Sequence, residues 1–287
     1  MSIKSFSPGS ITAFFQIDKD LKTGMPRSAG LSINLREGVT ASLRESLDTR
    51  VFWNGKSIEI PTVSSVLKQL SPSPVQIELE SPLPIGCGFG ISAAAALSSV
   101  FVLNEYFQLG KTKEELEKIC FLAEIEHGTG VGDVAAQMYG GIVHRYVFGE
   151  VGQRSHLQDL NHPQGLNHPQ GVNDFYCSVY GPISTKSVLQ SPVALDRVNH
   201  AGLKAIEQMK QKGTHSTWED LMDVSWIFSK ECGLLTPEVE RAAEKIKKKN
   251  GKAFMIMIGN SLVSTLPDED CHNTWKTNID PQGTRLL

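Results

Sequence analysis

Three glycines at alternate positions, Gly86, Gly88 and Gly90, stand directly before an apolar helix predicted over residues 92–107. Glycine has no Cβ, so backbone N–H groups in such a stretch can turn inward and approach a ligand closely. The N-terminus of the following helix would add unpaired donors and a partial positive charge. This spacing is suited to holding phosphate groups. The other interpretation is a glycine-rich turn in front of a core helix.

Two familiar phosphate motifs do not match this stretch. A P-loop requires G-x-x-x-x-G-K-S/T, but the Gly55-Lys56-Ser57 stretch has Arg50 at the position of the first glycine. A dinucleotide-binding fingerprint requires G-x-G-x-x-G, and Ile91 stands at the position of its third glycine. The sequence therefore indicates a different class of phosphate site.

Side chains that could hold a metal ion follow the glycines. Phosphoryl transfer needs oxygen ligands for Mg²⁺ and a group that orients or deprotonates the attacking hydroxyl. Ser92 could supply one ligand, and Glu124 or Glu126 could supply another from a helix predicted over residues 112–127. Glu126 lies nearer the apolar stripe of that helix, whereas Glu124 stacks over Cys120. An acid in this place could also be a solvated helix end.

A second glycine-rich turn, with Gly128, Gly130 and Gly132, ends at Asp133. A carboxylate at the edge of a pocket can accept a proton or hold an alcohol in line for attack. The other interpretation is that Asp133 caps the helix predicted to begin at Val134. The two roles can coexist.

The stretch from Pro84 to Ala93 reads P-x-x-x-G-x-G-x-S-A and resembles the ATP-binding loop of the GHMP kinases. That family usually has Leu and Ser where Phe89 and Ile91 stand, whereas Ser92 is kept. The segment from Glu124 to Asp133 looks like a shortened form of the family's metal-binding and catalytic segment. The resemblance implies ATP and Mg²⁺ as cofactors, Ser92 and Glu124 as metal ligands, and Asp133 as the base. It also implies ATP contacts from Pro84, Gly86, Cys87, Gly88, Phe89, Gly90, Ile91, Ser92 and Ala93.

Five further segments extend the resemblance over nearly the whole chain and narrow it to the archaeal pantoate kinases. They are Ser7–Phe15, Gly128–Gln137, Gly181–Lys186, Leu235–Val239 and Met257–Asn260. The reaction that the resemblance implies is phosphorylation of (R)-pantoate by ATP to 4-phosphopantoate, on the route to coenzyme A. Asp133, Glu124 and Ser92 would be its catalytic residues.

Candidate substrate contacts are Arg145, Thr12 and Arg27. A guanidinium at Arg145 could hold the pantoate carboxylate through two hydrogen bonds, although a surface strand arginine is the alternative. Ser10 and Ala13 stand where the family usually has His and Gly. The rival hypotheses are a homoserine- or mevalonate-type kinase and a non-catalytic ligand-binding protein of the same fold.

Composition narrows the class of protein. The chain has 287 residues, 40% of them hydrophobic and 21% charged, with a net charge of −3, which gives no electrostatic signature of nucleic-acid or membrane binding. No apolar run approaches the ~20 residues of a membrane span, and the N-terminus lacks a signal-peptide core, so a cytoplasmic protein is expected. Five scattered cysteines without C-x-x-C spacing indicate free thiols. The resemblance also implies that the chain could form a homodimer.

The pattern of elements predicts an α+β protein. The resemblance implies a GHMP-kinase fold, with a ribosomal-protein-S5-like domain over residues 1–160 and a ferredoxin-like domain over residues 172–270. A tail over 271–287 is expected to be poorly ordered. A turn is expected at Pro8-Gly9, and a duplicated hexapeptide at 160–171 predicts a lengthened surface loop without chemistry. Further helices are expected near 62–70, 194–211, 216–230 and 236–249, and strands near 51–53, 57–60, 75–80, 142–147, 175–180, 253–258 and 262–266.

Overall fold

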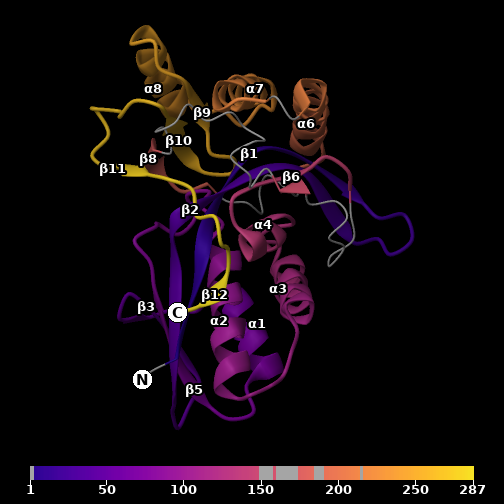
Figure 1. Cartoon of the computed structure of the whole chain (residues 1–287), viewed down its shortest axis with the longest axis vertical. Helices are drawn as coiled ribbons and strands as arrows, with labels where there is room; N and C mark the ends of the chain where they lie inside the picture. Colours follow the sequence, from indigo (N-terminus) through magenta and orange to yellow (C-terminus); the bar gives the residue numbers. More distant parts are fainter. Residues whose placement is uncertain (1–2, 149–157, 160–173, 184–190, 214–215) are drawn as a thin grey trace.

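Two β-sheets, each with helices packed against it, form the structure, a computed structural model that describes residues 3–148, 158–159, 174–183, 191–213 and 216–287 (Figure 1). The expected α+β organisation is confirmed, and the predicted helices and strands lie within a few residues of their expected bounds. In the described part of the chain, none of the helices is long and apolar enough to cross a membrane.

The first sheet has the strand order β12-β1-β2-β5-β3-β4, and β6 pairs with β2 and β7 beside this path. Its strands are β1 (Lys4–Lys19), β2 (Pro26–Glu45), β3 (Arg50–Trp53), β4 (Lys56–Ser57), β5 (Val75–Glu80), β6 (Ile142–Arg145), β7 (Gln158–Asp159) and β12 (Arg285–Leu286). Two helices, α2 (Ile91–Tyr106) and α4 (Asp133–Tyr139), pack on β1 and β2. Against α2 in turn pack α1 (Pro61–Leu70) and α3 (Lys113–His127).

The second sheet has the strand order β11-β8-β10-β9. Its strands are β8 (Phe175–Gly181), β9 (Ala253–Met255), β10 (Asn260–Ser264) and β11 (Thr274–Thr277). The helices near it are α6 (Pro192–Lys212), α7 (Trp218–Glu231) and α8 (Pro237–Lys248). Contacts join α7 and α8 to this sheet, while α6 packs on β1, so the long strand β1 touches both halves of the molecule.

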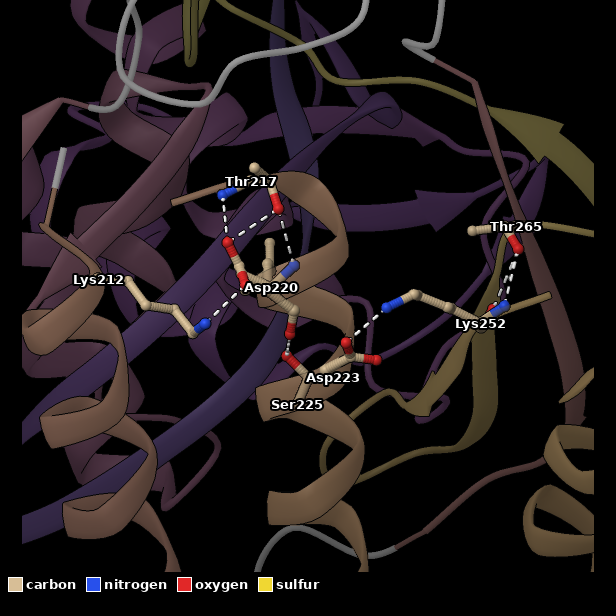
Figure 2. A network of polar contacts seen from close by, with 8 residues as sticks. Lys212, Thr217, Asp220, Asp223, Ser225, Lys252 and Thr265 are labelled. Atoms are coloured by element: carbon tan, nitrogen blue, oxygen red, sulfur yellow. Dashed lines mark hydrogen bonds and ion pairs between the residues drawn. The ribbon is translucent and has the colours of Figure 1, made fainter. Parts of the chain in front are cut away.

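Polar contacts around the first turn of α7 join it to its neighbours (Figure 2). Thr217 and Asp220 form a capping box at the start of the helix, and Lys212 of α6 pairs with Asp220 at 2.7 Å. Asp223 pairs with Lys252, which precedes β9. These contacts hold α7 between α6 and the second sheet.

The helix that follows the glycines, α2, is buried along most of its length. Its alanine side chains are small, which permits close packing on all sides. Side chains of Ala93, Ala94, Ala95 and Ala96 are all fully buried, so α2 can lie close to the sheet and to α1 and α3. The next helix, α3, begins with the predicted capping box, in which Thr112 and Glu115 exchange side-chain and backbone hydrogen bonds.

Pro8 and Gly9 lie within strand β1, so the prediction of a turn at these residues is wrong. Strand β1 continues through these residues with a bulge between Pro8 and Ser10, and the Ser10 N–H then donates to the Phe89 carbonyl at 2.9 Å. A Cβ at Gly9 would lie 2.4 Å from the Leu83 side chain, so glycine permits this close approach. The bulge brings β1 against the glycine-rich stretch.

The expectation of a poorly ordered tail is also wrong. Strand β11 pairs with β8, β12 pairs with β1, and the side chains of Asp280 and Thr284 are buried. Polar residues in this segment bond to backbone groups of β2 and α4, which composition does not reveal. The expected domain boundary at 160–172 and the duplicated hexapeptide lie outside the described residues, so the division into domains stays a prediction.

Candidate active site

A cavity of about 270 Å³ lies where the glycine-rich stretch, α3, α4 and strands β1, β2 and β6 meet. It brings together most of the predicted site residues, which come from distant parts of the chain. Those that line it are Thr12, Gly86, Gly88, Phe89, Gly90, Ile91, Ser92, Glu124, Asp133 and Arg145. The chain therefore places its candidate phosphate-binding, metal-binding, proton-accepting and anion-binding groups around one space.

The glycine-rich stretch has backbone conformations that require glycine. The φ angles of Gly86, Gly88 and Gly90 are 77°, 86° and 60°, in the left-handed region. A Cβ at Gly88 would also lie 2.8 Å from Ile256. Gly90 is the N-cap of α2, so the first amides of that helix have no acceptor within it and can meet an anion.

Glu124 is the buried acid of the site. Its side chain is 2% exposed, and its Oε1 accepts hydrogen bonds from Ser92 Oγ at 2.6 Å and from Thr129 Oγ1 at 2.8 Å. Burial raises the pKa of Glu124 to about 7, although these two hydrogen bonds oppose the rise. Glu126, the other candidate on α3, is exposed. Of the two acids, the structure brings only Glu124 to the cavity.

A second carboxylate, Asp133, stands beside the first. Burial raises the pKa of Asp133 to about 6, while the charge of Arg145 and a hydrogen bond with Thr12 act in the opposite direction. The N-cap of α4 is Gly132, and Asp133 is the first residue inside the helix. No side chain caps this helix, so the interpretation of Asp133 as its cap is wrong. Its carboxylate is left to face the cavity.

Arg145 is a half-buried guanidinium at the end of β6. Its Nη1 donates to the carbonyl and to the hydroxyl of Ser28 at 3.3 Å and 3.4 Å, which fixes its direction. Burial lowers the pKa of Arg145, and the carboxylates of Glu117 and Asp133 oppose that effect. Among the described residues, both hydrogen bonds come from Nη1 of Arg145, so the N–H groups of its other two nitrogens can donate to an anion.

Four predicted positions do not line the cavity: Pro84, Cys87, Ala93 and Arg27. Arg27 pairs instead with Asp18 at 2.8 Å and with Asp20, near the end of the β1–β2 hairpin. The two positions that depart from the family pattern, Ser10 and Ala13, are fully buried and also lie outside the cavity lining.

Sequence reasoning missed two hydroxyl groups of the site. Thr129 binds Glu124, and its place between two glycines of the second turn could have suggested it. Ser28 supports Arg145 from β2, and no local pattern marks it. A side chain at Gly132 would lie 2.8 Å from Ser28 Oγ, which explains a glycine there.

Replacing Glu124 with Gln should stabilise the protein at pH 8 and change its stability little at pH 5. The pKa of Glu124 rises from 4.5 to about 7 on folding, so the folded state binds this proton more tightly than the unfolded chain. That contribution is complete below pH 4.5 and is lost as the pH rises through about 7. Ionisation of the buried carboxyl therefore costs about 3 kcal/mol at pH 8, which glutamine avoids.

Thermal unfolding of the metal-free, nucleotide-free protein at the two pH values checks this prediction. The control is Glu126→Gln on the same helix, whose exposed side chain contacts Ser65 and His127 and should change the stability at pH 8 far less than Glu124→Gln. A Glu124→Gln shift that does not depend on pH would contradict the assignment of a raised pKa to this group.

Comparisons with known proteins agree with the geometry. Residues 59–141 match the family model of the GHMP kinases N terminal domain. The chain is 30% identical over 289 residues to the pantoate kinase of Thermococcus kodakarensis, covering 94% of this chain and 89% of that protein. A solved structure described as a phosphotransferase related to the CoA biosynthesis pathway has a TM-score of 0.82 at 23% identity, covering 100% of this chain and 99% of the other. The homoserine kinase of Cytophaga hutchinsonii has a TM-score of 0.67 at 17% identity, covering 100% and 97%. These likenesses confirm the expected fold.

Proposed function

Because the chain belongs to the pantoate kinases within the GHMP kinases, we propose that it transfers the γ-phosphoryl group of ATP to the 4-hydroxyl of (R)-pantoate. The observation that carries the proposal is the position of Asp133, in one cavity with the N-terminus of α2 and the guanidinium of Arg145. A carboxylate in this place shares one cavity with donors for a phosphate and donors for a carboxylate.

The glycine-rich stretch and the first amides of α2 would bind the phosphates of ATP. Ser92 and Glu124 would hold Mg²⁺, since a hydroxyl and a carboxylate are the oxygen ligands that this ion prefers. In the described residues, no group of three or more His, Cys, Asp and Glu side chains could hold a metal. The rest of the coordination shell would therefore come from phosphate oxygens and water. When bound, Mg²⁺ would neutralise charge on the phosphates.

Asp133 would accept the proton of the attacking hydroxyl. With a pKa of about 6, its carboxyl is mostly ionised at neutral pH and still basic enough to share a proton in the transition state. Thr12 would keep the carboxylate in place through their hydrogen bond. Arg145 would bind the carboxylate of pantoate, which leaves the hydroxyl at the far end of the substrate to face Asp133.

The apolar part of the cavity suits the rest of the substrate. Phe14, Val131 and Val143 line it together with the polar groups already described. Pantoate carries two methyl groups between its carboxylate and its 4-hydroxyl, and these would be removed from water against such side chains. Homoserine fits less well, because it lacks these methyl groups and its ammonium group would be repelled by the cationic Arg145. The likeness to a homoserine kinase is moreover one of fold alone.

A panel of acceptors tests the proposal. The protein is incubated with ATP and Mg²⁺ and with (R)-pantoate, homoserine or mevalonate, and the products are assigned by ³¹P NMR. We expect turnover of pantoate to 4-phosphopantoate to exceed that of the other two acceptors. Strong turnover of mevalonate without turnover of pantoate would overturn the substrate assignment. Binding of ATP with no turnover of any acceptor would favour a non-catalytic protein.

A further inference from the structure

Gln137, one turn after Asp133 on α4, has a fully buried side chain whose Nε2 donates to the carbonyl of Gly90 at 2.9 Å. We infer that Gln137 is a positioning residue that joins the phosphate-binding stretch to the helix carrying the base. The inference rests on the proposed function, since it assigns ATP to the amides at the start of α2. It gives a role to a residue that does not itself line the cavity.

Asp133 and Gln137 approach the same glycine from one face of α4. Residues four apart on a helix lie on the same side, one above the other. A Cβ at Gly90 would lie 2.6 Å from Gln137 Nε2 and 3.2 Å from Asp133 Cγ. Gly90 is thus the point where the glycine-rich stretch meets the helix of the proposed base, and a larger residue would push the two apart.

The hydrogen bond fixes a peptide plane that faces ATP. In a trans peptide the C=O and the following N–H point in opposite directions, so a fixed Gly90 carbonyl also fixes the Ile91 amide. That carbonyl already accepts the Ala94 N–H at 3.0 Å, the first hydrogen bond of α2. The Ile91 amide has no acceptor inside the helix, and Ile91 lines the cavity. Gln137 therefore adds a second hydrogen bond that holds this donor toward the nucleotide.

Gln137 is in turn fixed from outside α4. Its backbone carbonyl accepts the N–H of Thr284 at 2.9 Å and the Thr284 hydroxyl at 3.0 Å. The same hydroxyl lies 2.9 Å from Ser7 Oγ on β1. Backbone and side chain thus have separate partners, so the structural role of this residue can be separated from its role toward Gly90.

The test compares Gln137→Met with Thr284→Val. Methionine is nearly the same size and removes the bond to Gly90, and Gln137 Oε1 has no partner among the described residues, so nothing else is lost. The affinity for ATP with Mg²⁺, measured by calorimetry without acceptor, should fall several-fold, because the Ile91 amide is no longer held toward the nucleotide. A loss of about tenfold, the effect of one buried hydrogen bond, is the upper limit. Thr284→Val should lower the melting temperature and leave ATP affinity unchanged. Unchanged ATP affinity in Gln137→Met, or equal losses in both variants, would overturn the inference.

A second variant, Gln137→Glu, can restore the donor to Gly90 when its carboxyl is protonated, and such a rescue of ATP affinity is a readout that a purely structural role would not give. At pH 5.5 the introduced carboxyl can be protonated and can donate to Gly90, whereas at pH 8 its charge would repel the carbonyl, the phosphates and Asp133. At pH 5.5 we expect ATP to bind Gln137→Glu more tightly than Gln137→Met, and at pH 8 this advantage should disappear. Equal ATP affinity of the two variants at pH 5.5 would also overturn the inference. Because both measurements omit pantoate, failure of pantoate turnover would count against the proposed function alone.

Discussion

Asp133→Asn should lower kcat for pantoate about a thousandfold, which lies within the usual contribution of a general base. The amide has nearly the shape of the carboxylate and can still bond with Thr12, but it cannot accept the proton of the attacking hydroxyl. The phosphate-binding amides belong to the glycine-rich stretch and α2, so ATP should bind no more weakly than to the wild type. Single-turnover kinetics with ATP and pantoate, together with calorimetry for ATP alone, separate the two effects.

The pH dependence of kcat/KM tests whether Asp133 is the group that acts as the base. A base is active when ionised, so kcat/KM of the wild type should fall about tenfold per pH unit below the Asp133 pKa of about 6. Any ionisation of Glu124 required for binding Mg²⁺ with ATP would show separately, in the pH dependence of ATP affinity. The residual activity of Asp133→Asn should lack the acid limb of the wild-type profile. Unchanged turnover in the variant would remove Asp133 from the mechanism.

The phosphate-binding stretch, Ser92 and Asp133 can be predicted from the sequence because the spacing of glycines and acids is a local pattern. Alternating glycines before an apolar helix require a particular backbone, and Ser92 follows them in sequence. The choice between Glu124 and Glu126 was beyond a helical wheel, which measures distance from the apolar stripe and not from a loop elsewhere in the chain. In the folded protein, Glu124 is the acid that accepts hydrogen bonds from Ser92 and Thr129.

The groups that sequence reasoning missed depend on long-range contacts. Gln137 meets Gly90 only because a helix of seven residues packs over a stretch that lies 47 residues earlier. The segment after residue 270 has a polar composition typical of a mobile end, yet Thr284 and Asp280 bond to α4 and to neighbouring backbone groups. Such partners satisfy buried polar groups, and their positions follow from tertiary packing and not from any local pattern.

Arg145→Met should raise the KM for pantoate at least a hundredfold, the loss expected when one partner of a buried charge pair is removed. The same change should also affect the base. The charge of Arg145 opposes the rise in the pKa of Asp133, so without it that pKa should lie above about 6. The acid limb of the kcat/KM profile should therefore move to higher pH, while the affinity for ATP should not weaken, because the phosphates are assigned to the amides of α2 and Arg145 on β6 is assigned to pantoate.

Arg145→Lys separates geometry from charge. Lysine keeps a cation near Asp133, so the acid limb should stay close to its wild-type position, but an ammonium cannot bind a carboxylate with two parallel hydrogen bonds. The KM for pantoate should then rise less than in Arg145→Met. The two variants should differ more in the position of the acid limb than in kcat. Steady-state kinetics between pH 5 and pH 9 with saturating ATP give both quantities. A normal KM in Arg145→Met would mean that another group binds the carboxylate. A shifted acid limb with a normal KM would leave Arg145 only the role of tuning Asp133.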